Sequence, residues 1–93
     1  MELVFSKTAN GSWSAEFEAT ADFNMHLEGV VEGNVRVSQR GTSEGSYADV
    51  RGATPYPSFS NVYDMDFSAI IYPKWIKVVC PNEPTMAVVT FAE

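Results

Sequence analysis

Cysteine, histidine and basic side chains are scarce in this sequence, and each scarcity excludes a class of protein. The 93 residues include one cysteine, Cys80, so no disulfide forms within the chain. A single histidine, His26, is too few for the Cys and His clusters that hold structural zinc. Only 6 lysines and arginines stand against 12 acidic residues, a formal net charge of −6. That balance disfavours nucleic acid as a partner, because gripping phosphates needs clustered basic side chains.

Targeting segments and long apolar runs are also missing. The first residues contain neither the basic nor the apolar region of a secretory signal peptide. No apolar run approaches the roughly 18 residues that a membrane span needs. We therefore expect a protein made in the cytoplasm, with no membrane partner. No segment of helical length has apolar residues at 3.6 spacing, so we expect no helices.

Length predicts one domain, residues 1–93, of marginal stability. A chain of this size buries only about 60 to 65% of the surface that it exposes when unfolded. Small domains gain stability from disulfides, metals or partner chains, and the composition excludes an internal disulfide and a structural zinc site. We therefore expect a homo-oligomer or a place in a larger protein assembly.

Strict alternation of apolar and polar residues over 13–28 is the clearest positive signal. Period two over this length predicts β-structure with one buried and one solvated face. A single strand of that length would be too long for the domain, so a turn is expected. A loop of Thr20, Ala21 and Asp22 keeps both halves in phase and predicts a hairpin with Ala19 opposite Phe23. The apolar positions are Trp13, Ala15, Phe17, Ala19, Ala21, Phe23, Met25 and Leu27.

Further short strands are expected at 3–6, 35–40, 47–51, 62–71, 74–80 and 85–92. In the second of these, Arg36 and Arg40 face outward and are expected to meet acidic side chains of neighbouring strands, namely Glu16, Glu18 or Glu28. About eight short strands predict an all-β, antiparallel β-sandwich of jelly-roll or immunoglobulin-like type, with a small barrel as the alternative.

The C-terminal third breaks the one-sided pattern, because apolar residues occupy both faces of its strands. One face carries Ile76, Val78, Met86 and Val88. A second apolar face needs a cover, and we expect a subunit interface there. The alternative is that these are central strands covered by the chain's own aromatic loop around Tyr56 and Phe59. The predicted interface residues are Ile70, Tyr72, Trp75, Val79, Val89 and Phe91.

Aromatic residues in the central region form a candidate ligand loop. Residues 52–61 contain two prolines, which interrupt strand pairing, together with Tyr56 and Phe59, and Tyr47 lies on the short strand before them. A sugar ring or a partner protein stacks on aromatic side chains that stay exposed. Packing into the core is the alternative for each of them.

The remaining reactive side chains indicate no catalysis. His26 lies between Asn24 and Glu28 on the polar face and is expected to be an ordinary exposed histidine. Cys80 is expected to pack as a small apolar residue.

Asp64 and Asp66 share one face of a strand and form a weak calcium candidate with Asp49 or Glu44. The sequence has no glycine-rich phosphate loop, nucleophile elbow or histidine pair for a metal. We therefore expect no cofactor and no enzymatic activity. The weaker alternative is a small enzyme completed by a second subunit.

The segments Asn10–Ala19, Tyr72–Val79 and Pro84–Phe91 resemble small all-β virion proteins of tailed bacteriophages. Such proteins decorate capsids or form head fibres. The resemblance covers most of the chain and implies a structural role with self-association, but it assigns no role to any residue. The expected function is therefore that of a structural, self-associating accessory protein of a virion. A carbohydrate- or cell-surface-binding module, with a glycan as ligand, is the alternative.

Overall fold

A computed structural model describes residues 1–30, 34–50, 56–57, 62–68 and 71–92. Every regular element in these residues is a β-strand, as the alternation predicts. The strands are β1 (Ser6–Lys7), β2 (Trp13–Ala19), β3 (Phe23–Glu28), β4 (Asn34–Arg40), β5 (Ala48–Asp49), β6 (Tyr56–Pro57), β7 (Val62–Phe67), β8 (Lys74–Cys80) and β9 (Met86–Phe91).

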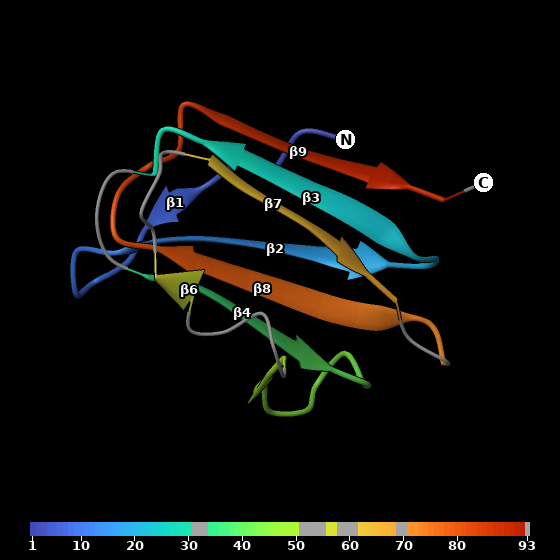
Figure 1. The fold of residues 1–93 in the computed structure, drawn as a ribbon. Helices are drawn as coiled ribbons and strands as arrows, with labels where there is room; N and C mark the ends of the chain where they lie inside the picture. Colours follow the sequence, from blue (N-terminus) through green and yellow to red (C-terminus); the bar gives the residue numbers. More distant parts are fainter. Residues whose placement is uncertain (31–33, 51–55, 58–61, 69–70, 93) are drawn as a thin grey trace.

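The strands form two antiparallel sheets. The larger has the order β1-β2-β8-β4-β5, with β6 also pairing with β4, and the smaller has the order β7-β3-β9. Figure 1 shows them as two layers, with β9, β3 and β7 in one and β2, β8 and β4 in the other. The radius of gyration is 12.4 Å, which matches the value of about 12 Å for a compact domain of this length. The all-β, two-sheet architecture predicted from the sequence is confirmed.

The core is the apolar layer between the sheets. In the larger sheet, Ala15 of β2 lies opposite Val78 of β8, which lies opposite Val37 of β4, and all three point inward. No polar or charged residue is buried in the described part of the chain. The buried residues are Phe5, Ala15, Ala19, Phe23, Met25, Leu27, Val30, Val35, Val37, Tyr63, Ile76, Val78, Cys80 and Val89.

The hairpin predicted across Thr20–Asp22 is wrong. Strand β2 pairs with β1 and β8, whereas β3 pairs with β7 and β9, so the chain crosses from one sheet to the other at this turn. The odd-length loop keeps Ala19 and Phe23 in phase, and both are buried. An arch between facing sheets satisfies that parity as well as a hairpin does, because both bring the apolar faces to one layer.

The N-terminal residues connect the two sheets. The Leu3 amide donates to the Ala87 carbonyl at 3.0 Å, and the Val89 amide donates to the Met1 carbonyl at 2.8 Å, so the first residues cover the outer edge of β9. The chain then crosses to the larger sheet, where β1 pairs with the start of β2. This arrangement protects one of the exposed edges that sheet proteins must manage.

The central region pairs more than the sequence predicted. Tyr56 and Pro57 were expected to lie in an irregular loop, but they form β6 and pair with Val35 and Asn34. Proline is tolerated here because β6 pairs with β4 alone. At such an edge strand, the missing N–H of proline interrupts no hydrogen bonds to a further strand.

The turn after β3 requires glycine at position 29. Its φ is +78°, and a Cβ at this position would lie 2.4 Å from the Thr85 side-chain oxygen and 2.9 Å from the Thr85 backbone nitrogen. The space is closed because Thr85 donates from its amide to the Glu28 carbonyl at 2.8 Å. The close contact between the end of β3 and the start of β9 therefore requires glycine at position 29, for its positive φ and for its lack of a side chain.

We expect Gly29→Ala to lower the free energy of unfolding by about 1–3 kcal/mol or more, because a strained backbone and a contact with Thr85 add together. Urea denaturation measures the change. Gly11→Ala is the matched control, since Gly11 has φ +90° but open space around it. The control is expected to lose less, and equal losses would show that the contact with Thr85 contributes nothing.

Candidate functional site

Three adjacent strands of the larger sheet turn a partly apolar, charged face away from the core. Directly paired residues project to the same side of a sheet, so the outward residues of β2, β8 and β4 form rows. We call this surface the β8 face, since β8 runs along its middle. Its rows are Ser14, Val79 and Arg36; Glu16, Lys77 and Ser38; and Glu18, Trp75 and Arg40.

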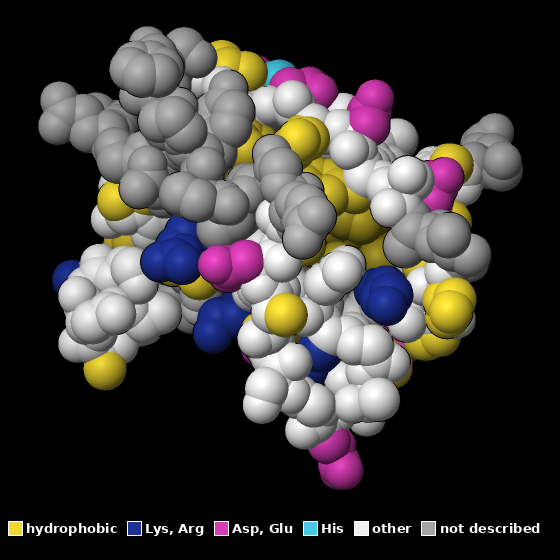
Figure 2. Space-filling view, turned by 60° about the horizontal axis from the view of Figure 1, so that its bottom comes forward, with side chains coloured by type: hydrophobic (Ala, Val, Ile, Leu, Met, Phe, Trp, Pro, Cys, Tyr) yellow, Lys and Arg dark blue, Asp and Glu magenta, His cyan; other side chains and the backbone are white. Residues whose placement is uncertain are grey.

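Charge is segregated across the β8 face. Glu16 and Glu18 give β2 an acidic side, and Arg36 and Arg40 give β4 a basic side. Strand β8 separates the two, so the predicted pairing of these arginines with Glu16, Glu18 or Glu28 is wrong. Arg36 instead contacts Asp49 of β5 at 3.3 Å. Figure 2, with the β4 and β5 side turned forward, shows basic and acidic side chains next to one another.

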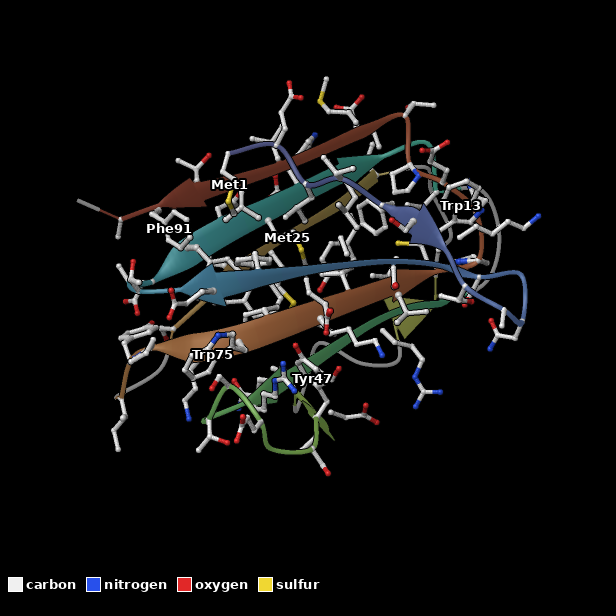
Figure 3. The ribbon with its side chains drawn as sticks, turned by 180° about the vertical axis from the view of Figure 1, so that it is seen from behind. Met1, Trp13, Met25, Tyr47, Trp75 and Phe91 are labelled. Carbon is white, nitrogen blue, oxygen red and sulfur yellow. The ribbon has the colours of Figure 1, made fainter. Side chains whose placement is uncertain are left out.

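Tyr47 covers part of this face. Its ring lies 4.5 Å from the Arg40 guanidinium and 5.7 Å from the Lys77 ammonium, both cation–π contacts. Arg40 also donates to the Gly45 carbonyl at 3.1 Å, which ties the loop before Tyr47 to β4. Burial, and then a hydrogen bond to Glu16, raise the pKa of Tyr47. Figure 3 shows Tyr47 and Trp75 from behind, at the β4 and β8 strands.

Two of the predicted interface residues lie on the β8 face. Trp75 and Val79 point outward and are half-buried, while Ile76 and Val78 between them point into the core. The two-sided character predicted for this strand is thus confirmed. Tyr72 lies just before β8, and its hydroxyl donates to the Asp22 carboxylate. Ile70 lies outside the described residues.

The face assigned to the last strand is wrong. Val89 was expected on the outer face, yet it is 0% exposed. It lies opposite Met25 of β3, which is in the core, and Phe91 packs on the same side. Met86 and Val88, expected inside, are paired with the outward residues of β3. Nearly every position of β9 is apolar, so alternation along the strand does not distinguish its two faces.

Of the predicted ligand loop, only Tyr47 has a described side chain. Tyr56 belongs to β6, where its backbone pairs with Val35, and Phe59 lies outside the described residues. Tyr47 lies on the β8 face, where it contacts Arg40 and Lys77.

The outer face of the smaller sheet holds a charged network around His26. Its Nδ1 lies 2.7 Å from an Asp64 carboxylate oxygen, and its Nε2 lies 2.7 Å from a Glu28 oxygen. Asn24 donates to Asp64 at 2.7 Å and to Asp66 at 2.9 Å. Only the imidazolium donates from both nitrogens, so the geometry favours the protonated ring. Hydrogen bonds to Glu28 and Asp64 raise the pKa of His26, and those from Asn24 and His26 lower the pKa of Asp64.

The weak calcium site predicted from the carboxylates does not form. Asp64 and Asp66 lie on β7 of the smaller sheet, whereas Asp49 lies on β5 of the larger one and Glu44 lies in the loop before it. Among the described residues no group of three or more His, Cys, Asp or Glu side chains is arranged to hold a metal ion. Asp64 instead accepts a hydrogen bond from His26.

Comparison with known proteins adds no functional assignment for these residues. Models of protein families, curated proteins and solved structures each gave no match to this chain. The described residues contain no helix long and apolar enough to cross a membrane. The surfaces themselves therefore carry the functional argument.

We expect the His26 imidazole to titrate above its ordinary pKa of 6.5. Its bonds to carboxylates stabilise the fold fully below pH 6.5, and this contribution is lost as the pH rises through the raised pKa. Asp64 has the opposite sign, since its contribution is lost as the pH falls through its lowered pKa. NMR titration of this single histidine measures the effect. Glu28→Gln is expected to bring the value down, and a wild-type value at or below 6.5 would contradict the network.

Cys80 is expected to be unreactive in the folded protein. It is 0% exposed, and burial raises the pKa of its thiol to about 12, so almost no thiolate is present at pH 8. A chromogenic disulfide reagent is expected to label it only in denaturant. An Ala9→Cys variant supplies an exposed control thiol that reacts at once. Equal labelling rates for the two thiols would show that the core opens readily.

Proposed function

We propose that this chain is a non-enzymatic structural protein that self-associates or docks on a larger scaffold through the β8 face. The observation that carries the proposal is the double-sided character of β8. Trp75 and Val79 lie outward on a strand whose other side is in the core. Among the described residues, Tyr47 covers part of this face, since its ring contacts Arg40 and Lys77 and its side chain hydrogen-bonds Glu16. Trp75 lies on the middle strand of this face, and a large aromatic residue of this kind is a usual anchor of a protein interface.

The charge arrangement supports association rather than catalysis. Acidic and basic sides flank the middle strand, which presents Trp75, Lys77 and Val79, and such complementary patches orient partners as they meet. The carboxylates and cations of this face lie on rigid strands, and the described residues pair no activated nucleophile with a base there. The role also provides the extra stability that a small domain without disulfides lacks.

We further propose that the sandwich has jelly-roll wiring and that the scaffold is a virion, with the chain as a capsid decoration or head-fibre protein. Nested pairing supports the wiring. Strand β4 pairs with β5, β3 with β7, and β2 with β8, each pair enclosing the previous one along the chain. Jelly rolls are frequent in capsid proteins. The resemblance to accessory virion proteins of tailed bacteriophages supports the scaffold.

Glycan binding is the second candidate, favoured by the row that contains Trp75. A half-buried indole between Glu18 and Arg40 offers a stacking surface with charged hydrogen-bonding groups on both sides. A glycan array separates the two proposals. Saturable binding that Trp75→Ala abolishes, with a monomeric protein, would favour the sugar.

For assembly, we expect a solution mass above the 10.3 kDa of one chain and a tenfold or greater loss of association, about 1.4 kcal/mol, in Trp75→Asp. Light scattering over a concentration series measures both. Met86→Asp is the matched control, because Met86 is 46% exposed on the outer face of the other sheet, and its mass is expected to be unchanged. A wild-type monomer at every concentration would overturn the proposal.

A further inference from the structure

The second half of β2 is a sheet edge. Strand β1 pairs only with Trp13 and Ser14, whereas β8 pairs with all of β2. Within the described ranges no strand pairs with residues 15–19 on the side away from β8. Figure 1 shows that β1 ends well before the arrowhead of β2. Such an edge is a template for a further strand.

The register shows which backbone groups face this edge. The Thr8 amide donates to the Ser12 carbonyl at 2.7 Å, so Ser12 directs its carbonyl toward the β1 side. Along an antiparallel strand the backbone groups of alternate residues point the same way. Glu16 and Glu18 have the parity of Ser12. They therefore direct their backbone N–H and C=O groups to the same side of β2, beyond Ser6, where β1 does not reach. Ala15 and Ala19, with the opposite parity, are buried.

Side chains at the edge are charged outside and aromatic inside. Glu16 and Glu18 are exposed on the β8 face. Phe17 between them points toward the core, with its ring 6.4 Å from that of Phe91 and 5.2 Å from that of Phe23. Figure 3 places Phe91 beside the end of β2. A strand added at this edge therefore lies beside Glu16, Phe17 and Glu18 in turn.

A second copy does not fit this edge. Pairing β2 with its own twin about a two-fold axis at Phe17 puts Glu16 of one chain opposite Glu18 of the other. Like charges directly opposite each other destabilise a strand pair, and an outward charge is a common device against edge-to-edge association. Lys77 already lies opposite Glu16, whereas Trp75 lies opposite Glu18. The edge therefore selects a positively charged strand.

We propose that the edge at Glu16–Glu18 binds an extended segment of another protein, with Lys or Arg opposite each glutamate and an apolar residue opposite Phe17. The added strand exchanges backbone hydrogen bonds with Glu16 and Glu18, which is the strand-addition mode of peptide recognition. The inference rests on the assembly role proposed above and names the class of partner for it. It concerns the backbone edge of β2, which borders the β8 face, since Glu18 lies opposite Trp75.

The test uses the full chain and the capped peptide Thr-Lys-Val-Lys-Thr. We expect saturable binding at low salt, with amide shifts and slowed hydrogen exchange at Glu16 and Glu18 in NMR spectra. A matched peptide with both lysine amides N-methylated keeps the charge but lacks the donors, so we expect at least tenfold weaker binding. A peptide with Glu in place of Lys is expected not to bind.

Charge reversal supplies the protein control. Glu16→Lys with Glu18→Lys is expected to abolish binding of the basic peptide and to create binding of the acidic one. Equal binding of the N-methylated peptide, shifts confined to another strand, or no binding by the wild type would each overturn the inference. If the variant fails to fold, the wild-type comparison of the three peptides still decides. Solution mass tests the assembly role separately, so each proposal can fail alone.

Discussion

The apolar layer between the two sheets is the constraint on which the rest of this structure depends. Every long strand places alternate residues in that layer, and the buried residues of the described chain are all apolar. Burial at about 25 cal/mol per Å² of apolar surface is the main favourable term available to a chain without a disulfide. Polar and charged residues therefore lie on the outer faces and at the edges.

The two outer faces differ because their strands differ. The smaller sheet carries a closed network, in which His26, Asp64 and Glu28 satisfy one another at 2.7 Å. The β8 face instead has acids on β2 and arginines on β4, with Trp75, Lys77 and Val79 between them. The side chains of a satisfied network have few free hydrogen-bonding groups for a partner, whereas covering Trp75 and Val79 removes apolar surface from water.

Edges add a second level of organisation. The N-terminal residues cover β9, and β5 and β6 both pair with β4. The stretch of β2 beyond β1 has no such neighbour among the described residues, and its outward side chains are two glutamates. Charge at an open edge prevents pairing with a second copy and selects the charge of any strand that does add.

Alternation over 13–28 determined, by itself, the all-β class and which side chains of β2 and β3 enter the core, because period two assigns each residue to a face. The same reasoning placed Trp75 and Val79 of β8 opposite Ile76 and Val78. It did not reveal that β2 and β3 lie in different sheets, since an arch and a hairpin share the same parity. Nor did it orient β9, where Val89 and Val88 are equally apolar.

Tertiary pairing alone decided the sites. The His26 network exists because β7 brings Asp64 beside β3, and the open edge exists because β1 begins only at Ser6, opposite Ser14. Both depend on which strands become neighbours, and that is set by packing of the whole apolar layer rather than by the pattern within any one segment.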